Sequence, residues 1–166
     1  KAHIDPMGTL MLFLFGFGYA KPVQVRMRNF NKPKRDMALV ALAGPVSNLI
    51  QSFVFFLFYS ACIAIASNSG SEVVQYFGIF FFFAGAINVN LAVFNLLPVP
   101  PLDGSRLATA LLPSKYYFKI MQYERYIQIG LFVLLFTGVL TTPLAFLSNL
   151  IRNLLIFVTS LPFGLL

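Results

Sequence analysis

Asp103 is the residue of this chain whose type and position most clearly suggest chemistry. Residues 95–104 read Asn-Leu-Leu-Pro-Val-Pro-Pro-Leu-Asp-Gly, so the carboxylate follows an apolar run and three prolines and precedes a glycine. An ionisable group beside hydrocarbon is costly, and a function is therefore its default interpretation. Carboxylate oxygens are common ligands of zinc and related metal ions. A helix cap or an interfacial anchor is the alternative, and the chemistry of the residue alone does not decide between them.

Polar side chains also recur along the two apolar segments that precede this motif. Asn88 and Asn95 are seven residues apart and share a helical face, while Asn48, Gln51 and Ser52 have the i, i+3, i+4 spacing of one face. Amides in hydrocarbon usually turn toward the interior of a helix bundle. We therefore expect both faces to look toward a shared polar centre. Purely structural hydrogen bonding is the alternative, and we favour it for Gln51, Ser52 and Asn88.

The composition is that of an integral membrane protein. Of the 166 residues, 58% are hydrophobic and 10% are charged, and the mean hydropathy is +0.81, which excludes an ordinary soluble domain. A net charge of +7 could suggest nucleic-acid binding, but six of the twelve basic residues fall between Lys21 and Arg35, in a loop between apolar segments. Membrane topology explains that cluster better. The single cysteine, Cys62, excludes an internal disulfide.

The elements that must position these residues are predicted to be membrane helices. The sequence is almost continuously apolar from Met37 to about Ser67, which is longer than a bilayer core requires, so a break is predicted at Gly44-Pro45 with a span starting at Pro45. The fold class is therefore an all-α polytopic membrane protein with about four transmembrane helices. Its further predicted elements are a second span over 74–97, a short helix over 105–112, a third span over 127–140 and a last helix over 144–161, which contains Arg152.

Residues 9–20 are apolar but too short to cross a membrane as a helix. From Phe13 to Tyr19, aromatic side chains alternate with Leu14, Gly16 and Gly18, which is the period of a strand. Because a lone strand cannot face lipid with unpaired amides, we predict a short re-entrant β-like segment that is buried in protein or lines a water-filled cavity. A short interfacial helix is the alternative.

The distribution of basic residues predicts the orientation in a cell membrane. The loop over 21–36 carries six of the twelve basic residues and the stretch over 105–126 carries four, whereas the connection over 67–71 has none. Basic loops stay in the cytoplasm. We therefore predict a multi-pass protein whose loops 21–36 and 105–126 are cytoplasmic, with Asp103 near the cytoplasmic boundary.

Four short motifs occur in this chain in a fixed order. They are His-Ile-Asp-Pro at 3–6 with Gly8, then Gly16-Phe17-Gly18, then Gly-Pro-x-x-Asn at 44–48, and Asn-x-x-Pro-x-Pro-x-Leu-Asp-Gly at 95–104. In this order they resemble the site-2 protease family of intramembrane zinc metalloproteases. The resemblance implies one membrane-embedded metalloprotease domain over 1–166, made of a re-entrant strand and basic loop (1–36), a core hairpin (37–104) and C-terminal helices (105–166).

The resemblance also implies roles for individual residues. Asp103 corresponds to the carboxylate ligand of a catalytic Zn²⁺ whose other ligands come from a His-Glu-x-x-His helix. Asn95 corresponds to a catalytic residue whose amide N–H could hold the oxyanion, and Asn48 to an asparagine that orients the substrate backbone. Gly16, Phe17 and Gly18 resemble a substrate-binding strand edge that pairs with an extended peptide. Supporting motif residues are Gly44, Pro45, Pro98, Pro100 and Gly104.

The His-Glu-x-x-His motif itself does not occur in these 166 residues, because the only histidine is His3. In the family this motif lies upstream of the His-Ile-Asp-Pro segment. We therefore expect the sequence to continue a longer chain that carries the motif, rather than to come from an inactive relative. We expect His3 itself to be structural.

The resulting functional hypothesis is an intramembrane zinc metalloendopeptidase that cleaves transmembrane substrate proteins in regulated intramembrane proteolysis. Its expected partners are a transmembrane protein substrate and the lipid bilayer, with no nucleic acid; the sequence leaves a homo-oligomer open. One alternative is a non-catalytic relative that binds transmembrane segments. Another is a small transporter or channel subunit that uses Asn48, Asn88 and Asn95 as an ion path.

Overall fold

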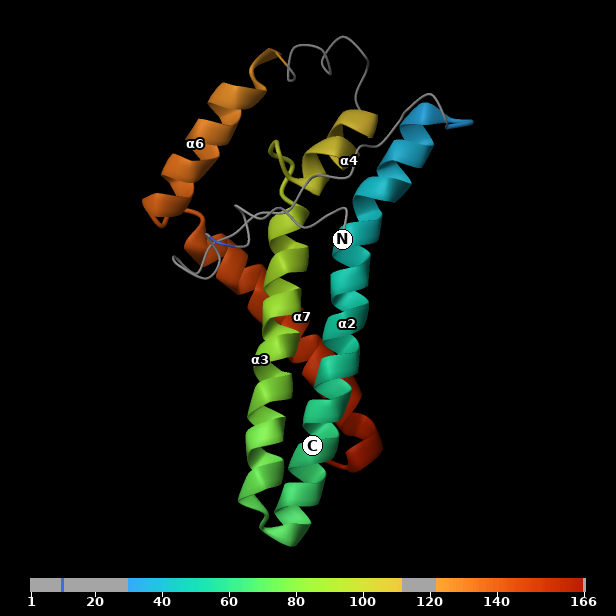
Figure 1. Ribbon diagram of the computed structural model, residues 1–166, viewed down its shortest axis with the longest axis vertical. Coiled ribbons are helices and arrows are strands. Elements are labelled where there is room, and N and C mark those ends of the chain that lie inside the picture. The colour runs from blue at the N-terminus through green and yellow to red at the C-terminus, as the bar shows by residue number, and fades with distance from the viewer. Residues whose placement is uncertain (1–9, 11–29, 112–121, 166) are drawn as a thin grey trace. The chain divides into compact units, whose positions relative to one another are not determined.

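The computed structural model describes residues 10, 30–111 and 122–165, and these are almost entirely helical (Figure 1). No strand occurs among them, so the all-α class is confirmed for this part of the chain, while the predicted β-like segment lies outside it. Contacts divide the chain into Lys1–Pro33 and Lys34–Leu166, and the site lies in the second unit. The elements are α2 (Pro33–Ser69), α3 (Glu72–Asn95), α4 (Asp103–Leu111), α6 (Glu124–Phe136), α7 (Thr141–Ser160) and the 3₁₀ turn η2 (Leu161–Phe163).

Three of the described helical segments are long and apolar enough to cross a membrane. They are Arg35–Ser69, Glu72–Asn95 and Thr141–Phe163. The predicted third span corresponds to α6, which has 13 residues and is therefore about 20 Å long, short of the ~30 Å of a bilayer core. The predicted count of four spans is thus not confirmed.

The predicted break at Gly44-Pro45 is wrong. Helix α2 continues through Pro45 over 37 residues. Pro45 has no N–H to donate to the carbonyl one turn earlier, but a proline can remain inside a membrane helix when other groups satisfy the local backbone. The carbonyl that loses its usual donor is that of Ala41. The Ser47 hydroxyl donates to a different carbonyl of this turn, that of Gly44, at 2.7 Å. At ~55 Å, α2 exceeds the hydrocarbon thickness, and its charged first turn, which contains Asp36, extends beyond the apolar part.

Helices α2 and α3 form an antiparallel hairpin, and α7 packs against it. The centre of the core is formed by Phe56 of α2 and by Val89 and Val93 of α3, all fully buried. The Phe56 ring lies against Gly85, where a Cβ atom would stand 2.8 Å from the ring. This glycine therefore lets α2 and α3 approach closely. The surrounding partly buried residues are Tyr59, Phe82, Leu144, Ile151, Leu155 and Ile156.

Hydrogen bonds between helices add specificity to this packing. The buried Ser52 hydroxyl donates to the Gly85 carbonyl at 3.0 Å, which gives Ser52 the structural role that we favoured for it. The hydroxyls of Ser60 and Thr159 share a hydrogen bond of 3.3 Å between α2 and α7. Arg152, inside α7, places its guanidinium carbon 5.8 Å from the centre of the Phe82 ring, a cation–π arrangement that offsets part of the cost of a charge in an apolar helix.

Candidate active site

A short ordered loop carries the chain from the end of α3 to Asp103. The Leu97 N–H donates to the Phe94 carbonyl at 3.1 Å, the Val99 N–H to the Leu97 carbonyl at 2.8 Å, and the Leu102 N–H to the Val99 carbonyl at 3.0 Å. Consecutive turns of this kind suit a proline-rich segment, because prolines need no hydrogen-bond acceptor. The loop therefore ends with Asp103 as the first residue of α4.

Gly104 is buried where α4 meets the end of α3. A Cβ atom at this position would overlap the backbone carbonyl oxygens of Leu96 and Leu97. The φ angle of Gly104 is not among the positive ones, so the glycine is required by this close approach and not by an unusual backbone conformation. The position of Asp103 thus depends on the absence of a side chain at the next residue.

The Asp103 carboxylate lies beside Gly44 of α2. A Cβ atom at Gly44 would stand 2.9 Å from Oδ2 of Asp103 and 3.9 Å from its Cγ. Asp103 is half-buried, and within the described ranges its carboxylate has neither a hydrogen bond nor an ion pair. A capping carboxylate at Asp103 could accept a hydrogen bond from the Ser105 N–H, but this N–H donates to the Leu102 carbonyl instead. The cap interpretation of Asp103 therefore has no hydrogen bond to support it.

The two predicted site asparagines lie on turns next to these contacts. Asn48 is four residues after Gly44 on α2 and therefore shares its face, and Asn95 is the last residue of α3, directly before the Leu96 carbonyl that Gly104 approaches. Both are half-buried, and neither makes a side-chain hydrogen bond to any residue that the structure describes. Asn88 differs, since its amide donates to the Ala84 carbonyl of its own helix at 2.9 Å.

This part of the chain offers one candidate donor for a metal site and no complete set. Among residues 10, 30–111 and 122–165, no three His, Cys, Asp or Glu side chains lie close enough to hold a metal ion. Asp103 could supply one carboxylate ligand. The predicted substrate-binding residues Gly16, Phe17 and Gly18 lie outside the described residues, as does His3.

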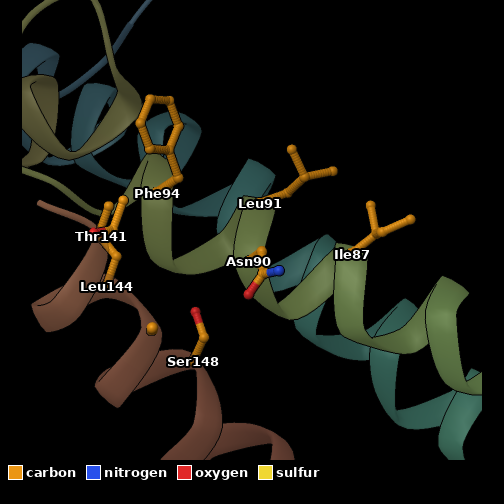
Figure 2. Close-up of a pocket in the computed structure, with 8 residues that line it drawn as sticks. Ile87, Asn90, Leu91, Phe94, Thr141, Leu144 and Ser148 are labelled. Atoms are coloured by element: carbon orange, nitrogen blue, oxygen red, sulfur yellow. The ribbon is translucent and has the colours of Figure 1, made fainter. Parts of the chain in front are cut away.

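A pocket between α3 and α7 was not predicted from the sequence (Figure 2). It has a volume of about 470 Å³ and is lined by three polar side chains, Asn90, Thr141 and Ser148, that no motif singled out. An asparagine in an apolar span was a signal for Asn90, whereas Ser148 resembles any small helical residue. The lining residues are Ile87, Asn90, Leu91, Phe94, Thr141, Leu144, Ala145 and Ser148.

Comparison with known proteins places this geometry in context. Residues 58–138, which include Asp103, match the sequence model of peptidase family M50. The chain is 43% identical over 129 residues to "Putative zinc metalloprotease YwhC" of Bacillus subtilis, covering 75% of this chain and 57% of that protein. It is 33% identical over 101 residues to "Putative zinc metalloprotease MJ0611" of Methanocaldococcus jannaschii, covering 61% and 48% respectively. The chain thus spans about half the length of these relatives. No solved structure matches it.

Proposed function

Because this chain belongs to peptidase family M50, we propose that its protein is an intramembrane zinc metalloendopeptidase that cleaves transmembrane substrate proteins in regulated intramembrane proteolysis. One observation carries the proposal. The Asp103 carboxylate stands at the start of α4, one short loop beyond the apolar helix α3, half-buried beside Gly44, with no hydrogen bond or ion pair to another described residue. A carboxylate in such a place is costly unless a ligand uses it.

Zinc is the cofactor that this proposal requires, and Asp103 fits one ligand position by the chemistry of its oxygen donors. The other ligands and the general base would be the two histidines and the glutamate of a His-Glu-x-x-His motif from outside these 166 residues, which contain one histidine. Bound zinc would supply Lewis-acid activation of the water that attacks the peptide bond.

The residues of this chain would bind and orient the substrate. The Asn95 side chain, at the end of α3, would donate an amide N–H to the oxyanion that forms on the attacked carbonyl, a task for which one fixed donor is worth about 100- to 1,000-fold in rate. Asn48 would hold the substrate backbone from α2. The strand edge at Gly16, Phe17 and Gly18 would pair with a locally extended substrate.

The proposal includes an orientation. The loops over 21–36 and 105–126, which together carry ten of the twelve basic residues, would lie on the cytoplasmic side of a cell membrane. Asp103 and Asn95 would then be near the cytoplasmic boundary, where cleavage could release a soluble domain from its membrane anchor.

Zinc removal provides the direct test of this function. We expect full-length protein in lipid nanodiscs to cleave a model transmembrane substrate, to lose cleavage after treatment with a zinc chelator, and to recover it when zinc is returned. Substrate-fragment formation on a gel measures the reaction, and chelator already loaded with zinc is the control. Cleavage that persists in zinc-free protein would contradict the proposal. Substrate binding without cleavage by zinc-loaded protein would indicate a non-catalytic relative.

Gly44→Ala is expected to impair this activity while leaving the fold intact. The new methyl group would stand 2.9 Å from Oδ2 of Asp103 and would push the carboxylate aside. Because only the end of a side chain must move, we expect little change in the unfolding temperature, whereas displacement of a reacting group by ~1 Å can cost ~100-fold in rate. Zinc content, kcat and thermal unfolding in detergent are the measurements.

Gly78→Ala on α3 is the matched control for this substitution. Its Cβ atom would meet the Cβ of Cys62 at an ordinary 3.4 Å, far along the chain from Asp103. A Gly44→Ala protein with the zinc content and kcat of the unaltered protein would show that the contact between Gly44 and Asp103 has no functional role.

A further inference from the structure

The pocket between α3 and α7 contains two polar groups that have no hydrogen-bond partner among the residues that the structure describes. Figure 2 shows Asn90 on α3 and Ser148 on α7, with the Ser148 oxygen directed toward the α3 side of the pocket. Ser148 is 5% exposed and Asn90 is exposed, and within the described part of the chain neither side chain makes a hydrogen bond. The third polar lining residue, Thr141, differs because its hydroxyl donates to the Gly138 carbonyl.

Several polar side chains of these helices are paired with their own backbone, whereas Asn149 and Asn153, which are exposed on α7, have no such bond among the described residues. Asn88, two residues before Asn90, donates to the Ala84 carbonyl of its own helix, and Ser160 of α7 donates to the Phe157 carbonyl. An amide or hydroxyl that faces hydrocarbon without a partner costs on the order of 1–3 kcal/mol by protein mutational data. Because Ser148 is buried and its oxygen is directed into the pocket, its free hydroxyl, with the exposed Asn90 amide on the opposite wall, points to a ligand that supplies polar groups.

The chemistry of the pocket distinguishes between the ligands that a membrane can offer. A lipid acyl chain has no hydrogen-bonding group. An intact transmembrane helix has its peptide groups paired internally, and such a helix occupies on the order of 2,000 Å³, against a pocket of about 470 Å³. A short stretch in which a helix has opened exposes free N–H and C=O groups together with apolar side chains. It matches both the polar pair and the apolar walls formed by Ile87, Leu91 and Leu144.

The pocket also lies close to the candidate active site along α3. Phe94 lines it, and the next residue is Asn95, the last of the helix. Asn90 is about 8 Å from Asn95 along the helix axis and about 140° around it, so the two side chains lie on different faces of α3. A peptide held at Asn90 would therefore pass around the end of α3 to reach the loop to Asp103.

We propose that this pocket binds the opened stretch of a transmembrane substrate, with the Asn90 amide and the Ser148 hydroxyl hydrogen-bonded to its free peptide groups. The inference rests on the proposed protease function for the identity of the substrate, but the binding step does not require cleavage. The pocket then selects substrates by how readily their helix opens, because the peptide groups of a closed helix leave no donor or acceptor free for Asn90 and Ser148.

Two fluorescent peptides test the proposal on full-length protein in nanodiscs, depleted of zinc so that no cleavage occurs. Both are transmembrane peptides of about 20 leucines and alanines; one carries a central Gly-Pro pair that opens the helix, and the other is uninterrupted. We expect the interrupted peptide to bind more tightly. Asn90→Leu and Ser148→Ala should each weaken its binding by about fivefold, the usual worth of one hydrogen bond, and Asn90→Gln should restore part of the loss.

Asn88→Leu is the matched control, because it removes the same side chain from the same helix, where the amide is paired internally. Its Kd should equal that of the unaltered protein. Equal binding of both peptides, absence of binding, or an unchanged Kd in both Asn90→Leu and Ser148→Ala would overturn the inference. The expected Kd pattern in a protein that never cleaves after zinc is returned would support the pocket and refute the protease function.

Disulfide crosslinking locates the bound peptide. In a Cys62→Ser background, Leu91→Cys in the pocket wall should crosslink to a cysteine beside the Gly-Pro pair, whereas Phe80→Cys, which is exposed on α3 but does not line the pocket, should not. Crosslinking at both positions to the same extent would overturn the inference. Absence of crosslinking at Leu91→Cys, because another segment of the full-length protein fills the pocket, would also overturn the inference.

Discussion

Asp103→Asn in the full-length protein is expected to remove most of the bound zinc and to lower proteolytic activity by about 100-fold or more. A neutral amide is a much weaker zinc ligand than a carboxylate. Mutation of a residue that only hydrogen-bonds to a metal ligand already lowers metal affinity or activity by ~10- to 100-fold. The unfolding temperature of the zinc-free protein should change little, because Asp103 makes no hydrogen bond or ion pair among the described residues. Metal analysis, substrate cleavage and thermal unfolding in detergent measure the three quantities.

Glu72→Gln is the matched control for this experiment. It also removes one negative charge, but from the exposed first residue of α3, at the opposite end of the helix from the candidate site. We expect its zinc content and activity to be unchanged. Full zinc and full activity in the Asp103→Asn protein would refute the ligand assignment. Full zinc with lost activity would assign Asp103 a role in the reaction other than metal binding.

Gly104→Ala is expected to disrupt both the structure and the site. The added methyl group would overlap the carbonyl oxygens of Leu96 and Leu97, and these belong to a loop whose turns are held by backbone hydrogen bonds. Because backbone must shift to admit the methyl group, we expect a loss of about 1–3 kcal/mol in stability, and displacement of Asp103 should reduce activity by ~100-fold. Thermal unfolding, zinc affinity and kcat are the measurements.

Gly130→Ala on α6 serves as the control, since a Cβ atom there has nothing within 4 Å. Alanine is the better helix former by about 1 kcal/mol, so this variant should be at least as stable as the unaltered protein. A Gly104→Ala protein with unchanged unfolding temperature and zinc affinity would show that α4 can move away from the end of α3 without consequence, so that the close approach at Gly104 does not position Asp103.

Hydropathy was sufficient to predict most of the helices, but it failed at Pro45. The hairpin of α2 and α3, the turn between them, the short helix α4 and the last helix α7 lie close to their predicted positions. Proline disfavours a helix interior in general, and a rule based on residue type therefore predicted a break. Whether the helix continues depends on its surroundings, because neighbouring helices can support a membrane helix that contains proline, and a rule based on residue type does not include those surroundings.

The candidate site was predictable to different extents. Asp103 and Asn95 stood out because ionisable and amide groups in or beside hydrocarbon are costly and because both lie in the motif over 95–104. Asn90 and Ser148 lie in no motif, and asparagine and serine in such helices can also pair with their own backbone, as Asn88 does. Only the tertiary structure distinguishes a polar group that is satisfied within its helix from one that faces a pocket.

The sequence by itself determined that this protein is a helical membrane protein and that its motifs follow the order of the M50 family. Both properties depend on residue type and on spacing along the chain, which are local. Only the tertiary structure decided that Gly44 faces the Asp103 carboxylate and that Gly104 leaves room for the carbonyls of Leu96 and Leu97. These contacts join segments that hydropathy treats as separate. They depend on how closely the helices and the loop approach, and at Gly44 and Gly104 that approach is set by the absence of a Cβ atom.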